Sequence, residues 1–308
     1  MTNATAQTAA AMSRFIARTT RGVPVRLTLL LLAAGLSANC ATLTPLPHAR
    51  GPVPPFDAKN VRRVVLIVLE NGNPATAAKQ SFLQARAAEG MVLTRYFAVA
   101  HPSQPNYVAM ISGSTAGALT DSPITLDRAH IGNALGTRWR VYAEDYPALT
   151  GKCNLIKQSG LYVRRHVPFL SFKDVQQGTC SQVVPFAQLK ADKLPDFAMI
   201  VPNLKHDGHR PATMKDANDW LNAQIAPLLE DAASTKDTVF IVTFDEDDSM
   251  NAQNNRVFTV LWGDHVQHGA RADVYDHEDL LATIAALLAV APPPFDEAGV
   301  RPIGGIWK

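Results

Sequence analysis

The chain has 308 residues, of which 47% are apolar and 18% are charged, and its formal net charge is +2. This length and apolar content are enough for one large domain with a full hydrophobic core. No basic stripe with interleaved aromatic residues is present, so nucleic acid is not expected as a partner.

Residues 1–40 have the pattern of a secretory signal peptide. Several arginines precede an apolar run at residues 27–36, and small residues follow it. The run is too short to span a bilayer stably. The pattern as a whole therefore predicts export from a bacterial cell to the periplasm, the medium or the outer membrane. Cys40 stands where a bacterial lipoprotein carries its lipidated cysteine. Soluble secretion and a lipid anchor at Cys40 remain alternatives, and no other membrane contact is expected.

Residues 41–60 are rich in proline and are predicted to form a tether. The remaining residues, 61–308, are predicted to form a single catalytic domain in which strands and helices alternate. Strands are predicted at residues 64–69, 91–96, 139–142, 197–201, 238–244 and 257–262. Helices are predicted at residues 75–89, after Asn106, and at residues 214–231 and 278–288. This alternation is typical of an α/β fold with three layers, in which a mostly parallel central sheet has helices on both faces.

Two cysteines, Cys153 and Cys180, remain in the domain once Cys40 is set aside. An exported domain with two cysteines most simply joins them in a disulfide bond. The residues between them show no strong periodicity. We therefore expect an irregular excursion at residues 150–182 that the bridge holds to the domain.

Oxygen-bearing side chains follow two of the predicted strands. Glu70 and Asn71 end the apolar run at 64–69, and Asp245 and Glu246 begin an acidic run after the strand at 238–244. Ligands of open α/β sheets bind at the carboxyl ends of strands, and carboxylate and amide oxygens suit a hard divalent cation. A turn, a helix cap or an acidic surface loop is the alternative for each pair taken alone. The pairs can share one metal only if the two strands lie close together.

The loop at residues 101–107 contains Ser103 between two prolines and precedes a helix. The N-terminus of a helix suits an anion such as phosphate, and a serine needs a base or a metal to act as a nucleophile. A helix-capping serine is the alternative.

Further candidate ligands follow the strand at 197–201. His206, Asp207 and His209 are suited to a metal or to phosphate, and His277 stands at the start of the last predicted helix. For His277, a capping role is an equally good interpretation.

In chain order, these motifs resemble those of a known family. The resemblance rests on Leu69-Glu70-Asn71, His101-Pro-Ser-Gln-Pro-Asn-Tyr107, Val201-Pro-Asn203 with Asp207 and His209, Phe244-Asp245-Glu246, and Asp276-His277. They are similar to the secreted bacterial acid phosphatases and phospholipase C-type phosphoesterases of the alkaline phosphatase superfamily. The small acid phosphatases that act on phosphoinositides are the most similar. The resemblance covers residues 64–288 and implies an alkaline phosphatase-like fold.

The resemblance also implies roles for individual residues. It implies metal ligands at Glu70, Asn71, Ser103, Asp245 and Glu246. Ser103 is also the implied nucleophile, and His209 and His277 are implied catalytic residues. The implied substrate-binding residues are His101, Asn106, Asn203 and Asp207. The metal is a divalent ion, for which calcium, magnesium, manganese, zinc and iron all remain open.

The function that follows from the resemblance is that of a secreted, metal-dependent phosphomonoesterase acting through a phosphoserine. A phosphorylated small molecule or a phosphoinositide is the expected substrate. A phospholipase C-type phosphodiesterase is the first alternative, and a non-catalytic metal-binding surface protein is the second. Lys157, Arg164, Arg165 and His166 in the excursion are expected either to meet a second negative charge on the substrate or to be solvated surface residues.

Overall fold

The computed structural model describes residues 42–43, 50–249 and 255–308. The chain divides into two compact units, residues 1–38 and residues 39–308, and the first lies outside the described residues. The predicted signal peptide and Cys40 therefore also lie outside them. In the described part of the chain, no helix is both long and apolar enough to cross a membrane.

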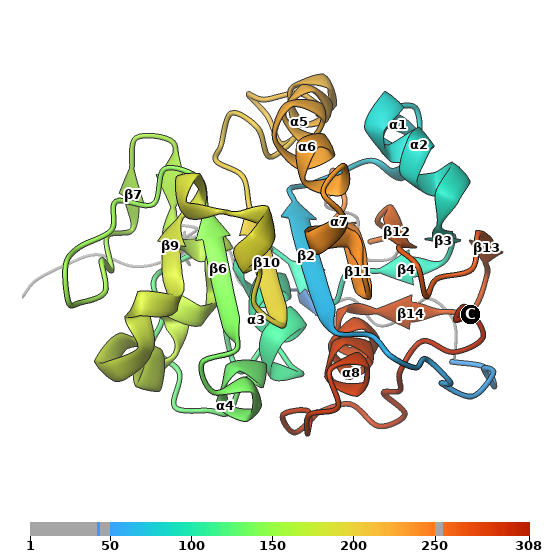
Figure 1. Ribbon diagram of the computed structural model, residues 1–308. Coiled ribbons are helices and arrows are strands. Elements are labelled where there is room, and N and C mark those ends of the chain that lie inside the picture. The colour runs from blue at the N-terminus through green and yellow to red at the C-terminus, as the bar shows by residue number, and fades with distance from the viewer. Residues whose placement is uncertain (1–41, 44–49, 250–254) are drawn as a thin grey trace, which may run out of the picture. The chain divides into compact units, whose positions relative to one another are not determined.

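An eight-stranded mixed sheet is the centre of residues 39–308, with strand order β13-β3-β12-β11-β2-β10-β6-β9 (Figure 1). In chain order the strands are β2 (Arg63–Leu69), β3 (Met91–Leu93), β6 (Trp139–Ala143), β9 (Val183–Pro185), β10 (Phe197–Val201), β11 (Thr238–Phe244), β12 (Thr259–Trp262) and β13 (Gly269–Arg271). The five strands β11-β2-β10-β6-β9 are parallel to one another, and β12 is antiparallel to both of its neighbours. The carboxyl ends of the five parallel strands therefore lie at the same edge of the sheet.

Helices cover both faces of this sheet, as predicted. On one face α3 (Ser103–Ser112) packs against α8 (His277–Leu287), and α8 contacts β2. On the other face α2 (Ser81–Glu89) packs against β12, and α7 (Ala232–Thr235) contacts β11. The other helices are α1 (Pro74–Ala77), α4 (Ile131–Leu135), α5 (Met214–Trp220) and α6 (Ala226–Leu229). The three-layer α/β/α prediction is confirmed.

Short strands and turns of helix complete the described structure. Three small ladders pair β1 (Thr42–Leu43) with β5 (Ala100–His101), β4 (Tyr96–Phe97) with β14 (Tyr275–Asp276), and β7 (Gln158–Ser159) with β8 (Tyr162–Val163). The 3₁₀ segments are Arg164–His166, Pro168–Ser171, Cys180–Gln182, Phe186–Gln188 and Ala191–Lys193. Two π segments span Val175–Thr179 and Leu221–Ile225.

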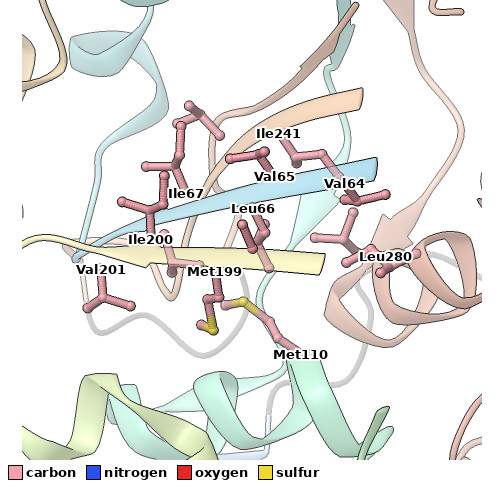
Figure 2. Close-up of a cluster of buried hydrophobic side chains, with 14 of the residues drawn as sticks. Val64, Val65, Leu66, Ile67, Met110, Met199, Ile200, Val201, Ile241 and Leu280 are labelled. Carbon is pink, nitrogen blue, oxygen red and sulfur yellow. The ribbon is translucent and has the colours of Figure 1, made fainter. Parts of the chain in front are cut away.

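The core explains why β2 lies at the centre of the sheet. Residues 64–69 have no exposed surface, because β10 and β11 flank the strand and helices cover both of its faces. Figure 2 shows side chains of β2, β10 and β11 packed with Met110 of α3 and Leu280 of α8. Burial of one such aliphatic side chain stabilises the fold by about 1.5–3 kcal/mol.

Two predicted helices are interrupted in the structure. The helix expected at 75–89 is α1 followed by α2, because Gln80 adopts an extended backbone conformation between them. The helix expected at 214–231 contains a π segment between α5 and α6, just before Pro227. Proline has no backbone N–H, so a regular α-helical hydrogen bond is lost at this position.

The predicted disulfide bond is present, with Cα atoms of Cys153 and Cys180 5.2 Å apart. The excursion that it closes contains β7, β8 and several turns of 3₁₀ and π helix. Residues 50–60, which the sequence assigns to a tether, contact the domain. Arg50 forms ion pairs with Asp276 and with Asp279, and the Phe56 ring packs edge-on against Trp307, 5.6 Å away.

Candidate active site

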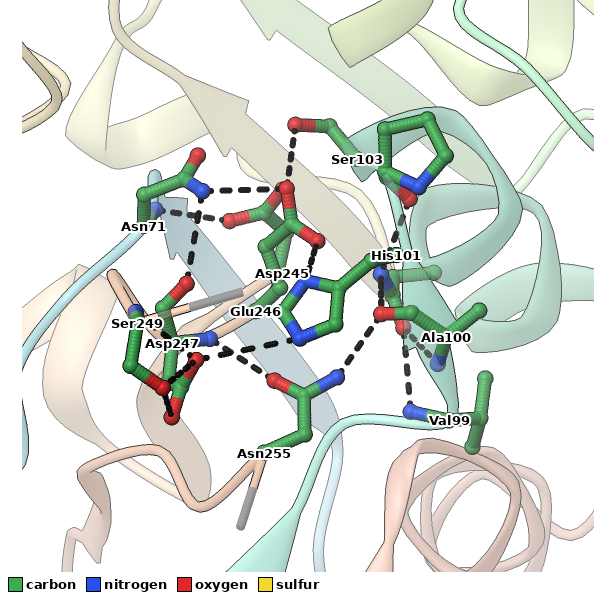
Figure 3. Close-up of polar contacts among 12 residues, drawn as sticks. Asn71, Val99, Ala100, His101, Ser103, Asp245, Glu246, Asp247, Ser249 and Asn255 are labelled. Atoms are coloured by element: carbon green, nitrogen blue, oxygen red, sulfur yellow. Dashed lines mark hydrogen bonds and ion pairs between the residues drawn. The ribbon is translucent and has the colours of Figure 1, made fainter. Parts of the chain in front are cut away.

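The two strands whose ends carry the predicted ligands are direct neighbours. Because β2 and β11 pair in parallel, Glu70 and Asn71 lie beside Asp245 and Glu246. The Asn71 backbone N–H donates to Asp245 Oδ1 over 2.9 Å, and its side-chain Nδ2 donates to Glu246 Oε1 over 3.0 Å (Figure 3). Asn71 has a positive φ of 31°, a region that asparagine tolerates better than most residues.

Gly72 allows the two strand ends to approach this closely. A Cβ atom at this position would lie 2.1 Å from Cδ1 of the Phe244 ring, the last residue of β11. Real Cβ contacts are not this short. The chain therefore needs glycine directly after the Glu70-Asn71 pair.

Ser103, the first residue of α3, contacts the same cluster. Its Oγ lies 3.1 Å from Glu70 Oε2 and 3.2 Å from Glu246 Oε1, and the side chain is buried. A serine hydroxyl has one proton, so at any moment it donates to one of these two carboxylates. Both are placed to hold that proton.

A second group of ligands surrounds Glu70 from the other side. Asp207 accepts a backbone hydrogen bond from Glu70, and His209 Nδ1 lies 3.6 Å from Glu70 Oε2. His166, from the excursion, places Nε2 3.0 Å from Glu70 Oε1, and its ring stacks on Tyr107 with centroids 5.1 Å apart. One ligand atom each of Glu70, His166 and Asp207 lies within 4.8 Å of the others.

His166 was not among the predicted site residues. The sequence assigned it to a group of basic residues that meet the substrate or the solvent, yet it is 1% exposed. The only signal in the sequence is its place in the excursion that the disulfide holds to the domain.

The carboxylates are buried close together, and this arrangement shifts their pKa values. Burial acts to raise the pKa of Glu70, but His166 and His209 outweigh it and hold this pKa well below its usual range. Burial, and then the charges of Glu70 and Glu246, raise the pKa of Asp245 well above its usual range. Burial, and then Glu70, raise the pKa of Asp207 to about 6. A cluster of this kind is stabilised by added positive charge.

Four oxygen atoms in the cluster are suited to provide contacts to such a charge. They are buried and form no hydrogen bond in the described part of the chain: Asn71 Oδ1, Asp207 Oδ2, Asp245 Oδ2 and Glu70 Oε1, the last of which has only its ion-pair contact with His166. Unsatisfied buried polar atoms are rare in folded proteins, and carboxylate and amide oxygens are the ligands of hard divalent cations. The residues present therefore fit a divalent metal ion.

Two predicted site residues, Asn106 and Asn203, use their polar atoms outside this cluster. Asn106 uses its side chain to accept from the N–H groups of Val99 and Ala100 and to donate to two carbonyl groups. Asn203 donates to Asp145 over 2.6 Å and accepts from the Lys205 N–H. Both side chains brace loops through these contacts, and their predicted role in substrate binding stays a prediction.

His277 lies behind the cluster. Its Nε2 is 2.7 Å from the Asp245 carbonyl oxygen, its Nδ1 is 3.0 Å from the Tyr96 hydroxyl, and the ring is fully buried. Burial lowers its pKa to about 4. The contact with the carbonyl group positions Asp245, and the catalytic role predicted for His277 stays a prediction.

His101 contacts Glu246 and Asp247, and its predicted role in substrate binding stays a prediction. Its Nδ1 forms a short contact with Glu246 Oε2, its Nε2 lies 3.7 Å from Asp247, and the ring is 2% exposed (Figure 3). His206, a weaker candidate, pairs with Glu144 through contacts of 3.0 Å.

A cavity of about 430 Å³ opens beside the cluster. Asn71 and His209 form part of its lining, and the His209 side chain is 42% exposed. The remaining lining residues are Asn73, Thr76, Gly208, Arg210, Ala212, Thr213, Met214 and Asp248. The cavity therefore reaches the cluster at Asn71 and His209.

The fold agrees with a known superfamily. A protein of the alkaline phosphatase superfamily from Vibrio parahaemolyticus has a TM-score of 0.55 at 12% identity, over 79% of this chain and 70% of that one. A sulfatase from Pseudoalteromonas sp. has a TM-score of 0.51 at 13% identity, over 80% and 73% of the two chains. The predicted alkaline phosphatase-like fold is confirmed.

Within this fold, the chain belongs to the Phosphoesterase family, whose sequence profile matches residues 75–291. The family relationship predicted from the motifs is thereby confirmed. The phosphate-repressible acid phosphatase of Penicillium chrysogenum is 33% identical over an alignment of 265 positions that covers 80% of this chain and 63% of that protein. The phosphatidylinositol-3-phosphatase of Mycobacterium tuberculosis is 29% identical over an alignment of 311 positions that covers 96% of this chain and 97% of that protein. The chain thus spans less than two thirds of the fungal protein and nearly all of the mycobacterial one.

Proposed function

We propose that this protein is a metal-dependent phosphomonoesterase of the acid phosphatase type, with Ser103 as its nucleophile. The observation that carries the proposal is the position of Ser103 Oγ, between Glu70 and Glu246 and beside buried oxygen atoms without partners. Acid phosphatases among the family members similar to this chain support the same reaction class.

A divalent cation would be held by Glu70, Asn71, Asp245 and Glu246, with Asp207 and His166 beside them, and would supply positive charge to the phosphoryl group. Ser103 Oγ attacks phosphorus as its proton passes to Glu246 Oε1, because the lowered pKa of Glu70 makes that carboxylate the weaker base. The bond from phosphorus to the leaving oxygen breaks, and a phosphoserine forms. In the second half a water molecule attacks phosphorus, and Ser103 leaves and recovers its proton.

His209 is the residue that we assign to the leaving group. It lines the open cavity, and its ring is the most exposed of the imidazoles around Glu70. Its interaction with Glu70, against the effect of burial, raises its pKa. A raised pKa keeps the imidazole protonated in mild acid, so it is able to donate a proton to the leaving oxygen and to accept one from the attacking water.

Replacement of the nucleophile tests this proposal. Ser103→Ala should lower turnover of p-nitrophenyl phosphate by at least about 1,000-fold, since it removes the covalent path. The matched control is Ser181→Ala, an exposed serine of the 3₁₀ segment Cys180–Gln182. Each protein is assayed with magnesium, calcium, manganese and zinc in turn, and after treatment with EDTA. A Ser103→Ala protein within tenfold of the parent would falsify the assignment.

The same assay separates the alternatives. A monoesterase hydrolyses p-nitrophenyl phosphate much faster than its bis-ester, a phospholipase C-type diesterase shows the reverse, and a non-catalytic metal-binding protein hydrolyses neither. Trapping of phosphate on Ser103, detected by mass spectrometry after an acid quench, tests the phosphoserine.

The substrate range and the location in the cell are further parts of the proposal. The similarity to a phosphatidylinositol-3-phosphatase over nearly the whole chain supports phosphoinositides as one class of substrate. The leader pattern in residues 1–40 supports export. Fractionation of cells that express the full chain, followed by N-terminal sequencing of the protein outside the cytoplasm, tests export.

A further inference from the structure

The cavity beside Asn71 and His209 is large enough for more than a phosphate group. A cavity of about 150 Å³ accommodates benzene, and this one is about 430 Å³. Its walls come from α1 on one side and from the chain leading into α5 on the other. Both segments lie near the carboxyl end of β2, where the ligand cluster is (Figure 1). Asn71, which lines this cavity, and Ser103 Oγ both contact Glu246 Oε1, so a phosphoryl group bound at Ser103 beside Asn71 would border the cavity.

One cavity that borders the excursion is far smaller. The cavity between Gln104, Asp121, Lys157 and Arg165 holds only about 10 Å³, which is roughly one water molecule. Arg164, expected either to meet a second negative charge on the substrate or to be a solvated surface residue, is buried and donates to the carbonyl oxygens of Ile124 and Leu170 over 3.0 and 2.8 Å. Neither alternative describes Arg164, because its guanidinium group holds the excursion together.

The chemistry of the larger cavity is set by few free groups. Asn73 and Thr213 cap helices α1 and α5 and are occupied there. Ala212 and Met214 supply an apolar surface. Arg210 is exposed, and in the described part of the chain it forms neither a side-chain hydrogen bond nor an ion pair. Asp248 is the acidic residue of the lining, and its Oδ1 lies 3.5 Å from Asn73 Nδ2.

We infer that this cavity receives the leaving group of the phosphomonoester, and that Arg210 recognises a second anionic group carried on it. The inference rests on the proposed phosphomonoesterase function and specifies its substrate class. Arginine suits this role because its planar, permanently charged guanidinium binds carboxylate or phosphate with two hydrogen bonds. The negative charge of Asp248 repels an anion. Arg210 should therefore favour a substrate with a second anionic group, and Asp248 should disfavour it.

The selectivity of Arg210 and Asp248 variants tests the inference. Phenyl phosphate and para-carboxyphenyl phosphate differ by one anionic group on the leaving side, and the ratio of their kcat/KM values measures selectivity. Arg210→Ala should lower the ratio of the carboxylated to the plain substrate by about threefold to fivefold, as expected for a partly exposed ion pair. Asp248→Asn should raise it by about twofold. Both effects should shrink at high salt.

A matched control removes the same charge elsewhere. Arg62 is exposed and precedes β2, at the end of the strand opposite Glu70, so Arg62→Ala should leave the ratio unchanged. Thr76→Trp, on the exposed side of α1, fills the cavity. It should raise KM for both substrates without changing inhibition by inorganic phosphate, which needs no leaving-group space.

The outcomes separate the inference from the proposed function. A parent enzyme that hydrolyses both substrates, with a ratio unchanged in Arg210→Ala, overturns the inference alone. A parent that hydrolyses neither overturns the proposed function. In that case the inference is tested by binding of benzylphosphonate and para-carboxybenzylphosphonate, and equal loss of both in Arg210→Ala overturns it.

Discussion

Substitution of His166 is the most direct test of the electrostatics of the site. Its Nε2 lies 3.0 Å from Glu70 Oε1, both side chains are buried, and its ring stacks on Tyr107. His166→Phe keeps a planar ring against Tyr107 but removes the partner of a buried carboxylate. Removing one partner of a buried ion pair costs about 3–5 kcal/mol. We therefore expect the free energy of unfolding to fall by this amount when no divalent cation is present.

Urea unfolding of the parent and the variant, in EDTA and in saturating divalent cation, measures this difference. A cation bound at Glu70 supplies the positive charge that the variant lacks, so the difference should shrink when the cation is added. His206→Phe is the matched control, because His206 also pairs with a carboxylate and stacks on Trp220, but its side chain is 24% exposed. Its loss should be at most about 1 kcal/mol and independent of cation.

Two results would refute this reasoning. One is a His166→Phe protein as stable as the parent in EDTA, which would mean that Glu70 does not depend on the imidazole. The other is a large loss that is the same with and without cation, which would mean that the ion does not bind at Glu70.

Two further predictions concern stability. Replacing Cys153 and Cys180 with serine should lower the free energy of unfolding by about 3.5 kcal/mol, because the bridge closes a loop with a sequence separation of 27. Urea unfolding without reductant measures this loss, and an unchanged urea midpoint would contradict the prediction. Burial, and then Asp276, raise the pKa of Glu278 from 4.5 to about 8, so the folded protein keeps a proton that the unfolded chain loses, and stability falls as pH rises through this range. Glu278→Gln should therefore raise Tm at about pH 9 and have little effect at about pH 4, and an equal change at both pH values would argue against the shift.

Much of the fold and part of the site could be predicted from the sequence because their signals are local. A continuous run of apolar, β-branched residues at 64–69 is suited to a strand buried on both faces, and the structure places it there. The run at 238–244 has the same pattern and the same outcome. The oxygen-bearing side chains that follow each run, such as Glu70 and Asp245, could be predicted as site residues because they come directly after a buried strand. Two cysteines in a domain with a predicted export leader were enough to predict the bridge.

The tertiary structure alone decided which of these parts meet. The pairing of β2 with β11 joins residues some 175 positions apart, and it depends on how whole strands and helices pack rather than on any local pattern. Residue type predicts what a polar side chain is able to bind, but not which way it points. Asn106 and His277 have the chemistry expected of site residues, yet backbone groups and a buried tyrosine occupy their polar atoms. His166 was missed for the converse reason: the irregular excursion has no periodicity from which the contact of its ring with Glu70 could be inferred, and only the folded chain brings the two together.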